Sequence, residues 1–353
     1  MGEWVNITVD SIVPTSRRAR QSKTKEWWVP LTEKAYAKFN GSYDNIVGGK
    51  TSWALTELTG GVAAEMELSW EIVNKLGRDK LKAFIRKYLH GRGIFCTSNL
   101  TESDDNDQSG IFETNGLVKA HAYSMLNIED VETSNGTVSL VRIRNPYGKV
   151  EWNGPWSDKS PEWDTVSEET KQSIEHSAHD DGEFFMSFDD WINEFELFTT
   201  CYIIGDSDVK LDTRAIGILV PGQNAGRIAE RRLRYNLQFT LKITEAQDVW
   251  FQTLQEAKSL KEESYVMLQL YKCDKLHKTK RNLRKDALGT YIDPLFPKNR
   301  ERSCVQYSHN GWVYQLEAGN YFIALVYYVS DQRKYMFRAI GKDLKMKSLA
   351  TDT

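Results

Sequence analysis

Apolar residues recur at helical spacing in two stretches near the start of the chain. The first runs from Pro30 to Phe39, and Gly41 is expected to end that short helix. The second lies within residues 79–90, where an apolar stripe predicts a longer helix that Gly91 closes. The stripe consists of Leu81, Phe84, Ile85, Tyr88 and Leu89.

Alternating apolar and polar residues predict strands elsewhere in the first half of the chain. Residues 4–12 alternate in this way up to Pro14, and residues 94–97 form a short apolar run. Two longer runs, 117–128 and 138–145, are rich in Val, Leu, Ile and Tyr. This composition is typical of strands, so we expect the two runs to form a neighbouring pair.

The pattern changes near Gly205. Before it, a helix is expected over residues 188–195 with Ser187 as its N-cap. Beyond it, turn residues separate short strand-like runs, and helical spacing is weak except around 250–258. This profile predicts an all-β sandwich of roughly 140 residues. Its clearest strand-like runs are 235–243, 264–271, 320–328 and 334–340.

Length and composition limit the class of protein. A chain of 353 residues suggests two or three domains, and Gly48-Gly49 is the favoured first boundary. Its net charge of -3 argues against nucleic acid as a partner. Four cysteines without a Cys-x-x-Cys spacing give no disulfide framework, and we identify no secretory signal or membrane span. A cytoplasmic protein is therefore expected.

One histidine and one asparagine lie in the two neighbouring strand-like runs. A lone strand histidine is usually a structural residue, but Asn145 in the second run gives His121 a possible partner. A cysteine protease needs an imidazole that exchanges a proton with its thiol. A neutral amide oxygen can hold that imidazole in one orientation. His121 and Asn145 are therefore candidate catalytic residues.

The register of the two strands tests this pairing. With a loop over residues 129–137, paired residue numbers sum to 266 and His121 faces Asn145. With a tight turn at Asn135-Gly136 they sum to 271, and Asn145 faces Leu126, roughly 17 Å away from His121. The longer loop is favoured, and a tight turn is expected to separate the two residues.

Five segments of this sequence resemble the calpain family of papain-like, calcium-dependent cysteine proteases. The resemblance covers most of residues 2–205 in order and extends more weakly over residues 211–345. The segments are Glu33–Lys38, Gly116–Ser124, Arg142–Gly148, Glu151–Asp158 and Asp181–Ser187.

The resemblance implies an α+β papain-like protease lobe, antiparallel β with helices, followed by an all-β C2-like sandwich. Residues 1–49 would be the end of a first protease lobe, residues 50–208 the second lobe, and residues 211–350 the sandwich. His121 and Asn145 match the catalytic pair of the second lobe. No cysteine has the Gly-Asp-Cys-Trp setting of the family's nucleophile, so the chain is expected to lack that residue and most of the first lobe.

Two positions beside the pair depart from the family pattern. Tyr147 stands where the family usually has Trp, the aromatic that shields the His–Asn bond from water. Ala120 replaces the glycine that precedes the histidine, which is expected to be a small change.

Acidic residues near Asn145 suggest calcium. Calcium takes six to eight oxygen ligands from carboxylates and carbonyls, and acids surround the glycine in Asp180-Asp181-Gly182-Glu183. By resemblance, the second-lobe calcium ligands are Glu151, Asp158, Asp181, Glu183 and the backbone carbonyl of His179. Glu26 matches a ligand of the first-lobe calcium site and should bind little alone.

The C-terminal region offers a second candidate surface. A basic run lies between two predicted strands and could attract an acidic phospholipid or an acidic loop. EF-hand calcium binding is excluded because no Asp-x-Asp-x-Asp-Gly loop occurs. The candidate basic residues are Lys278, Lys280, Arg281, Arg284 and Lys285.

Three functions follow from these observations. The favoured one is an incomplete calpain-type endopeptidase that cleaves protein substrates inside the cell. The second is a catalytically inactive calpain-like regulator or scaffold. The third is a C2-like module that binds lipid or protein.

Overall fold

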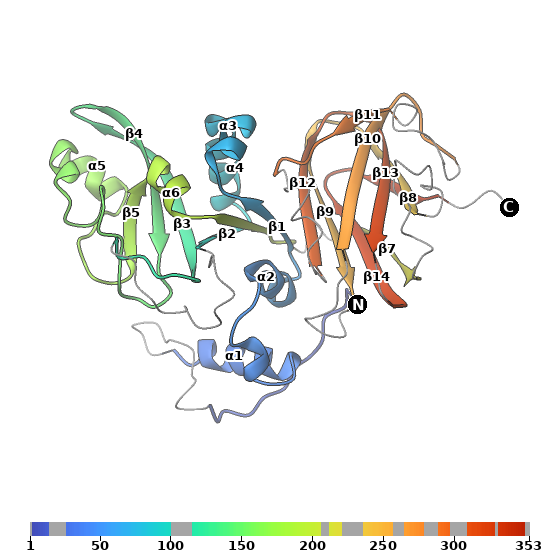
Figure 1. Ribbon diagram of the computed structural model, residues 1–353, viewed down its shortest axis with the longest axis horizontal. Coiled ribbons are helices and arrows are strands. Elements are labelled where there is room, and N and C mark those ends of the chain that lie inside the picture. The colour runs from blue at the N-terminus through green and yellow to red at the C-terminus, as the bar shows by residue number, and fades with distance from the viewer. Residues whose placement is uncertain are drawn as a thin grey trace. The chain divides into compact units, whose positions relative to one another are not determined.

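The computed structural model describes residues 2–13, 26–99, 115–205, 212–220, 236–256, 265–278, 289–296, 309–328 and 331–349. It divides into two compact units, and their elements are labelled in Figure 1. The two units are described separately below. One comprises Trp4–Leu58 and Glu67–Thr200, and the other comprises Met1–Glu3, Thr59–Met66 and Cys201–Thr353. The predicted lobe boundary at residue 49 does not coincide with a boundary between these units, and it stays a prediction.

The longer of the two predicted helices in the first unit follows its apolar stripe. In the helix over 78–89, Leu81, Phe84, Ile85 and Tyr88 are buried, as the spacing predicts. Ser187 caps the helix after it, since its Oγ accepts the N–H of Asp190 at 3.0 Å. The elements are α1 (Trp28–Phe39), η1 (Asp44–Ile46), α2 (Thr51–Thr59), α3 (Trp70–Leu76), α4 (Arg78–Leu89), η2 (Pro161–Thr165), α5 (Glu168–Ser173) and α6 (Phe188–Glu194).

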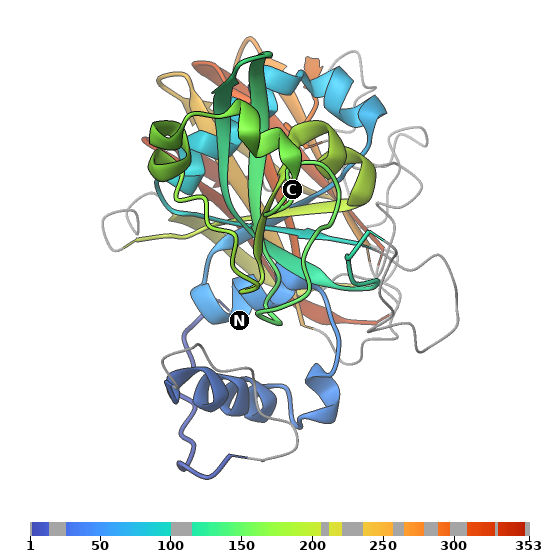
Figure 2. The same ribbon diagram turned by 90° about the vertical axis from the view of Figure 1, so that its left-hand side faces the viewer.

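A six-stranded sheet carries the long hairpin of this unit, which Figure 2 turns toward the viewer in green. The strand order is β1-β6-β2-β3-β4-β5. The pairs β2–β3, β3–β4 and β4–β5 are antiparallel. The strands are β1 (Val62–Glu67), β2 (Gly93–Ser98), β3 (Ala122–Thr133), β4 (Gly136–Arg144), β5 (Glu183–Ser187) and β6 (Leu197–Tyr202).

Residues 4–12 were expected to form a strand, and this prediction is wrong. The segment is extended but enters no sheet, and Trp4 and Ile12 are exposed. Lysines of α1 bind the segment instead: Lys34 Nζ contacts Asp10 Oδ1 at 2.6 Å, and Lys38 Nζ donates to Thr8 O at 2.7 Å. Alternation alone does not make a strand, because a strand also needs a neighbour for its backbone groups.

Two antiparallel sheets make up the second unit, as the all-β pattern beyond Gly205 predicts. Their orders are β11-β10-β13-β8-β15 and β12-β9-β14-β7. Buried side chains from both sheets, among them Phe239, Phe251 and Phe337, share one core. The strands are β7 (Asp212–Leu219), β8 (Leu237–Ile243), β9 (Gln247–Gln255), β10 (Tyr265–Cys273), β11 (Thr290–Ile292), β12 (His309–Leu316), β13 (Gly319–Tyr328), β14 (Arg333–Ile340) and β15 (Lys345–Ser348).

The helical spacing noted around residues 250–258 is also wrong. Residues 247–255 form β9, and every residue from Val249 to Gln255 is buried. A strand that is covered on both faces loses its period of two, so its apolar run resembles that of a buried helix.

Arg338 explains why a short segment from early in the chain belongs to this second unit. Its buried guanidinium donates to the carbonyl oxygens of Gly60 at 2.7 Å and Gly61 at 2.8 Å. Its Nε donates to Gln252 Oε1 at 2.9 Å. These contacts satisfy two backbone carbonyls just before β1.

Among the described residues, no helix is long and apolar enough to cross a membrane.

Candidate active site

A hydrogen bond joins the two candidate catalytic residues. His121 directly precedes β3, and Asn145 directly follows β4. The distance from His121 Nε2 to Asn145 Oδ1 is 3.0 Å. The N–H of Asn99 donates to His121 O at 3.2 Å, so the histidine backbone is fixed beside the end of β2. The two ends of the β3–β4 hairpin therefore meet at this pair.

Both predicted registers of the hairpin are wrong. The turn is tight and lies at Ser134-Asn135, because Thr133 pairs with Gly136. Paired residue numbers sum to 269 next to the turn and to 268 beyond an irregularity between Met125 and Asn127. The favoured long loop over 129–137 is thus absent.

The tight turn was expected to remove the site, and that expectation is also wrong. The irregularity leaves Leu126 unpaired, which moves the register by one residue. Continued by one pair, this register places Asn145 opposite Tyr123, so His121 is its diagonal neighbour on the same face. Diagonal neighbours lie within reach of an aromatic side chain. The pair forms although neither residue directly faces the other.

The amide of Asn145 is held in one orientation. It is fully buried, and its Nδ2 donates to Lys149 O at 3.0 Å and to Val150 O at 2.9 Å. With both N–H groups used, Oδ1 is the atom that faces His121, and it also accepts the N–H of Tyr147 at 2.9 Å. An amide oxygen only accepts, so Nε2 of His121 carries the hydrogen. Nδ1 is the nitrogen left for proton exchange.

Aromatic rings flank the histidine. The ring centroid of Tyr147 lies 4.3 Å from that of His121, and the centroid of Tyr123 lies 4.9 Å away at an interplanar angle of 82°. The Tyr123 hydroxyl is itself fixed, since it accepts the N–H of Val118 at 2.7 Å. Tyr147 thus packs against His121 at the position where a shielding aromatic was expected.

Ala120 holds an unusual backbone conformation beside the histidine. Its φ is 49°, in the left-handed region that favours glycine. An L-residue there costs roughly 1–2 kcal/mol. The replacement of glycine by Ala120 is therefore a larger change than the sequence indicated.

We expect Ala120→Gly to stabilise the protein against urea. The gain should be about 0.5–1 kcal/mol, because relief of the strain exceeds the extra freedom that glycine has in the unfolded chain. Ala122→Gly, in regular β3, is the matched control and should lower the stability by a similar amount. Equal losses in both variants would contradict the assigned strain.

The described cysteines have the properties of structural residues. Cys96 and Cys201 are buried, and burial raises the pKa of the Cys201 thiol to about 11. Burial likewise raises the pKa of Cys273 to about 11. A reactive cysteine needs a lowered pKa, so Cys201 and Cys273 are poor nucleophiles. Cys304 lies outside the described residues.

We expect Cys201 and Cys273 to react slowly with a thiol-specific disulfide reagent at pH 8. With a pKa near 11, roughly one thiol in a thousand is ionised at that pH. Labelling followed residue by residue with mass spectrometry should be fast only after denaturation. Rapid labelling of Cys201 in the folded chain would show that its surroundings have been misjudged.

Three carboxylates gather next to Asn145. Glu151 Oε1 accepts the N–H groups of Asp181 at 2.8 Å and of Gly182 at 2.7 Å. Burial and the neighbouring Glu151 raise the pKa of Asp158 to about 7, and Asp181 adds to this shift. Asp158 Oδ2 is buried without a hydrogen-bond partner.

The oxygens in this region are of the types that calcium binds. The buried, unpartnered oxygen of Asp158 lacks the compensation that a buried acid needs, and a cation beside the carboxylates would supply it. The carbonyl of His179 adds a fourth oxygen near this turn, since it accepts the N–H of Asp181 at 2.8 Å. Calcium prefers such a mixture of carboxylate and carbonyl oxygens.

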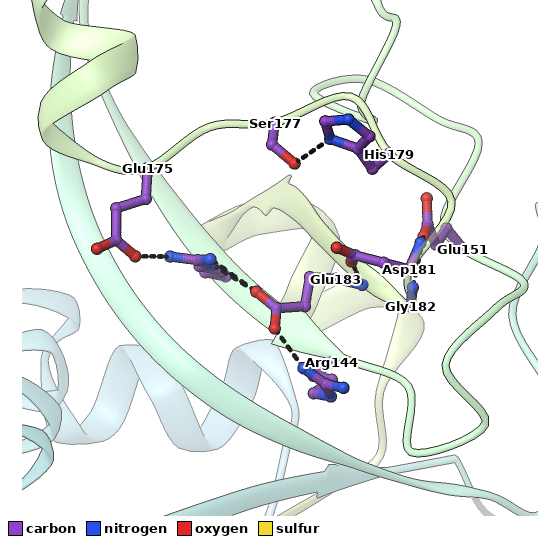
Figure 3. Close-up of polar contacts among 9 residues, drawn as sticks. Arg144, Glu151, Glu175, Ser177, His179, Asp181, Gly182 and Glu183 are labelled. Carbon is purple, nitrogen blue, oxygen red and sulfur yellow. Dashed lines mark hydrogen bonds and ion pairs between the residues drawn. The ribbon is translucent and has the colours of Figure 1, made fainter. Parts of the chain in front are cut away.

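The other predicted ligands are engaged elsewhere. Glu183 is paired with two arginines, as Figure 3 shows for Arg144. Glu26 accepts the indole N–H of Trp28 at 2.8 Å. The His179 ring, which was not a predicted ligand, lies 2.9 Å from Ser177 Oγ, and only the backbone carbonyl of His179 was expected to bind calcium. Although the residue types near Asn145 suit calcium, no group of three or more His, Cys, Asp or Glu side chains in the described ranges, Glu151, Asp158 and Asp181 included, is arranged to hold a metal ion.

Gly182 connects the acids to the catalytic pair, which the sequence did not reveal. Its N–H binds Glu151, and its carbonyl accepts the N–H of Asn145 at 2.7 Å. Its φ is +89°, and a Cβ there would lie 2.8 Å from Asn145 O. A glycine between acids was the only available signal for this role.

Comparison with known proteins identifies relatives of the first 200 residues. The family model described as calpain family cysteine protease matches residues 1–202. Calpain-9 of Rattus norvegicus is 38% identical over 209 residues, covering 58% of this chain and 29% of the relative. The calpain-1 catalytic subunit of Rattus norvegicus is 38% identical over 210 residues, covering 58% and 28%. The calpain-2 catalytic subunit of Homo sapiens is 34% identical over 210 residues, covering 58% and 29%. The matches thus span less than a third of each of these relatives.

Proposed function

Because this chain belongs to the calpain family of cysteine proteases, we propose that it supplies the histidine–asparagine half of a calcium-dependent endopeptidase. The second protease lobe is assigned to residues 50–208, with residues 1–49 as the end of the first. The observation that carries the proposal is the 3.0 Å bond between His121 Nε2 and Asn145 Oδ1. The substrates are other proteins, cleaved within the cytoplasm.

His121 exchanges the proton in this reaction. Its Nε2–H stays bound to Asn145, so Nδ1 takes the proton of a cysteine thiol. The resulting thiolate attacks the peptide carbonyl, and the imidazolium returns the proton to the leaving amine. Water then hydrolyses the thioester, with His121 accepting and returning a proton again. The cysteine comes from the first lobe, outside the residues assigned here.

Asn145 and Tyr147 keep the imidazole in place. The buried amide fixes the ring orientation, and the Tyr147 ring 4.3 Å away limits access of water to the His–Asn bond. Burial makes this hydrogen bond stronger than it would be in water.

In the proposed site, calcium would be held by Glu151, Asp158 and Asp181, together with the His179 carbonyl and Glu183. Such an ion would offset the charge of the three carboxylates, and these residues would then hold their loops in place next to Asn145. Glu26, which matches a ligand of the first-lobe site, contributes little by itself.

Residues 211–350 are assigned to a C2-like sandwich. Its two antiparallel sheets and shared core support this assignment. An acidic phospholipid or acidic loop is the proposed partner of the basic run. Of its candidates only Lys278 is described, because Lys280, Arg281, Arg284 and Lys285 lie outside the described residues.

A second candidate function is a catalytically inactive calpain-like regulator. The burial and raised thiol pKa of Cys201 favour it. One experiment separates the two functions: this chain is joined to a cysteine-bearing first lobe of a relative, and peptide hydrolysis is measured with and without His121. Calcium-dependent hydrolysis that is lost in His121→Ala supports the protease. A fusion that folds but shows no hydrolysis supports the regulator.

A further inference from the structure

Two arginines of β4 hold both carboxylate oxygens of Glu183. Arg142 Nη2 contacts Glu183 Oε2 at 2.6 Å, and its Nε contacts the same oxygen at 3.1 Å. Arg144 Nη1 contacts Glu183 Oε1 at 2.5 Å. Figure 3 shows the Glu183 carboxylate between its partners. The Glu183 side chain is 20% exposed, so solvent screens these pairs only in part.

The sheet positions these groups. Glu183 begins β5 directly opposite Arg144, and Arg142 is the next residue on the same face of β4. Arg142 is further held by Glu175 Oε2 at 2.9 Å, and its guanidinium carbon lies 5.8 Å from the centroid of the Phe185 ring. The arrangement is thus built by two strands rather than by mobile surface side chains.

Glu183 is also one of the proposed calcium ligands. Each of its oxygens already accepts charge-assisted hydrogen bonds, which are among the stronger ones in proteins. Two guanidinium groups that already contact this carboxylate repel a cation that approaches the same oxygens. We propose that Arg142 and Arg144 form an ion-pair latch on Glu183, which calcium must open and which raises the calcium concentration needed to fill the site. This inference rests on the calcium site proposed above.

The latch adjoins the segment that orients His121. Arg144 directly precedes Asn145, and Gly182 directly precedes Glu183. Gly182 O accepts the N–H of Asn145 at 2.7 Å, so β4 and β5 are bonded beside the latch. Opening the latch releases the side chains of Arg144 and Glu183, which flank the bond between Gly182 O and the N–H of Asn145. The latch therefore opposes calcium binding next to the residue that orients His121.

Calcium binding to the full chain tests the latch by isothermal titration calorimetry. Arg142→Gln and Arg144→Gln should each bind calcium about three- to tenfold more tightly than the unaltered chain, because the competing charge-assisted bonds are lost. Arg144 is 42% exposed, so its substitution keeps the test valid even if Arg142→Gln fails to fold. Thermal unfolding without calcium checks that each variant is folded.

Lys159→Gln is the matched control. Lys159 is exposed, and its charge acts on Asp158. In the described part of the chain, Glu183 forms its ion pairs with Arg142 and Arg144, and Lys159 is not among its partners. Its removal changes local charge and leaves the latch closed. Arginine variants that tighten binding no more than Lys159→Gln would overturn the latch.

Asp158→Asn separates failure of the latch from failure of the site. If Asp158→Asn abolishes calcium binding while the arginine variants bind like Lys159→Gln, the calcium site stands and the latch is wrong. If the unaltered chain and Asp158→Asn both bind no calcium, the site and the latch fall together.

Discussion

Joined to the cysteine-bearing first lobe of a relative, this chain is expected to hydrolyse an unstructured peptide in the presence of calcium. His121→Ala should lower kcat by about a thousandfold or more, because general acid–base catalysis and thiol activation are lost together. The His121 ring is held by a fully buried amide, and alanine leaves no imidazole at this position. Release of a fluorescent group from the peptide gives the rate.

Controls in this experiment separate chemistry from folding. The chain without the added lobe should show no hydrolysis above background, because the two described thiols with a pKa near 11 are not activated. Asn145→Ala should lower the rate less than His121→Ala, since the imidazole is still present but no longer fixed. Hydrolysis that persists in His121→Ala, or a folded fusion that binds calcium and cleaves nothing, would refute the proposed role.

Calcium is expected to stabilise the chain, and Asp158→Asn is expected to remove that effect. At a calcium concentration a hundred times the dissociation constant, binding contributes about 2.7 kcal/mol. For a unit of this size, that corresponds to a rise in melting temperature of roughly 5–10 °C. The neutral amide of Asn keeps the shape of the side chain but removes a buried charge that a cation needs as its partner.

Asp189→Asn is a suitable control for the calcium experiment. Asp189 is a partly exposed acid of α6 that pairs with Arg78, and it belongs to none of the proposed ligands. Its variant should keep the calcium-induced rise in melting temperature, measured by the loss of circular dichroism on heating. An unchanged rise in Asp158→Asn would exclude this residue from the site.

The sequence determined much of the fold by local patterns. The apolar stripe of α4, the Ser187 cap of α6 and the strand-like runs of β8, β10, β13 and β14 were all predicted. These features depend on the spacing of residues along a single segment, which can be read from the sequence alone. The strand predicted over residues 4–12 was wrong because a strand depends on a neighbour. The helical spacing around residues 250–258 was misleading because residues 247–255 form a strand whose burial on both faces removes the alternation.

For the candidate site, the sequence identified His121 and Asn145 but not how they meet. Their bond depends on a tight turn and an unpaired Leu126, which together set the register of two strands. A register is a property of hydrogen bonds between segments, and a shift of one residue changes every partner. No pattern within either strand distinguishes the predicted registers from the observed one.

The acids near Asn145 show the same division. The sequence named Glu151, Asp158, Asp181 and Glu183 as one group, yet the tertiary structure gathers the first three and pairs Glu183 with Arg142 and Arg144. Residue types determine which side chains are chemically suitable as ligands, and the sequence was sufficient to predict these. Which oxygen is available depends on the competing charges that β4 brings within 3 Å, and only the folded sheet decides that.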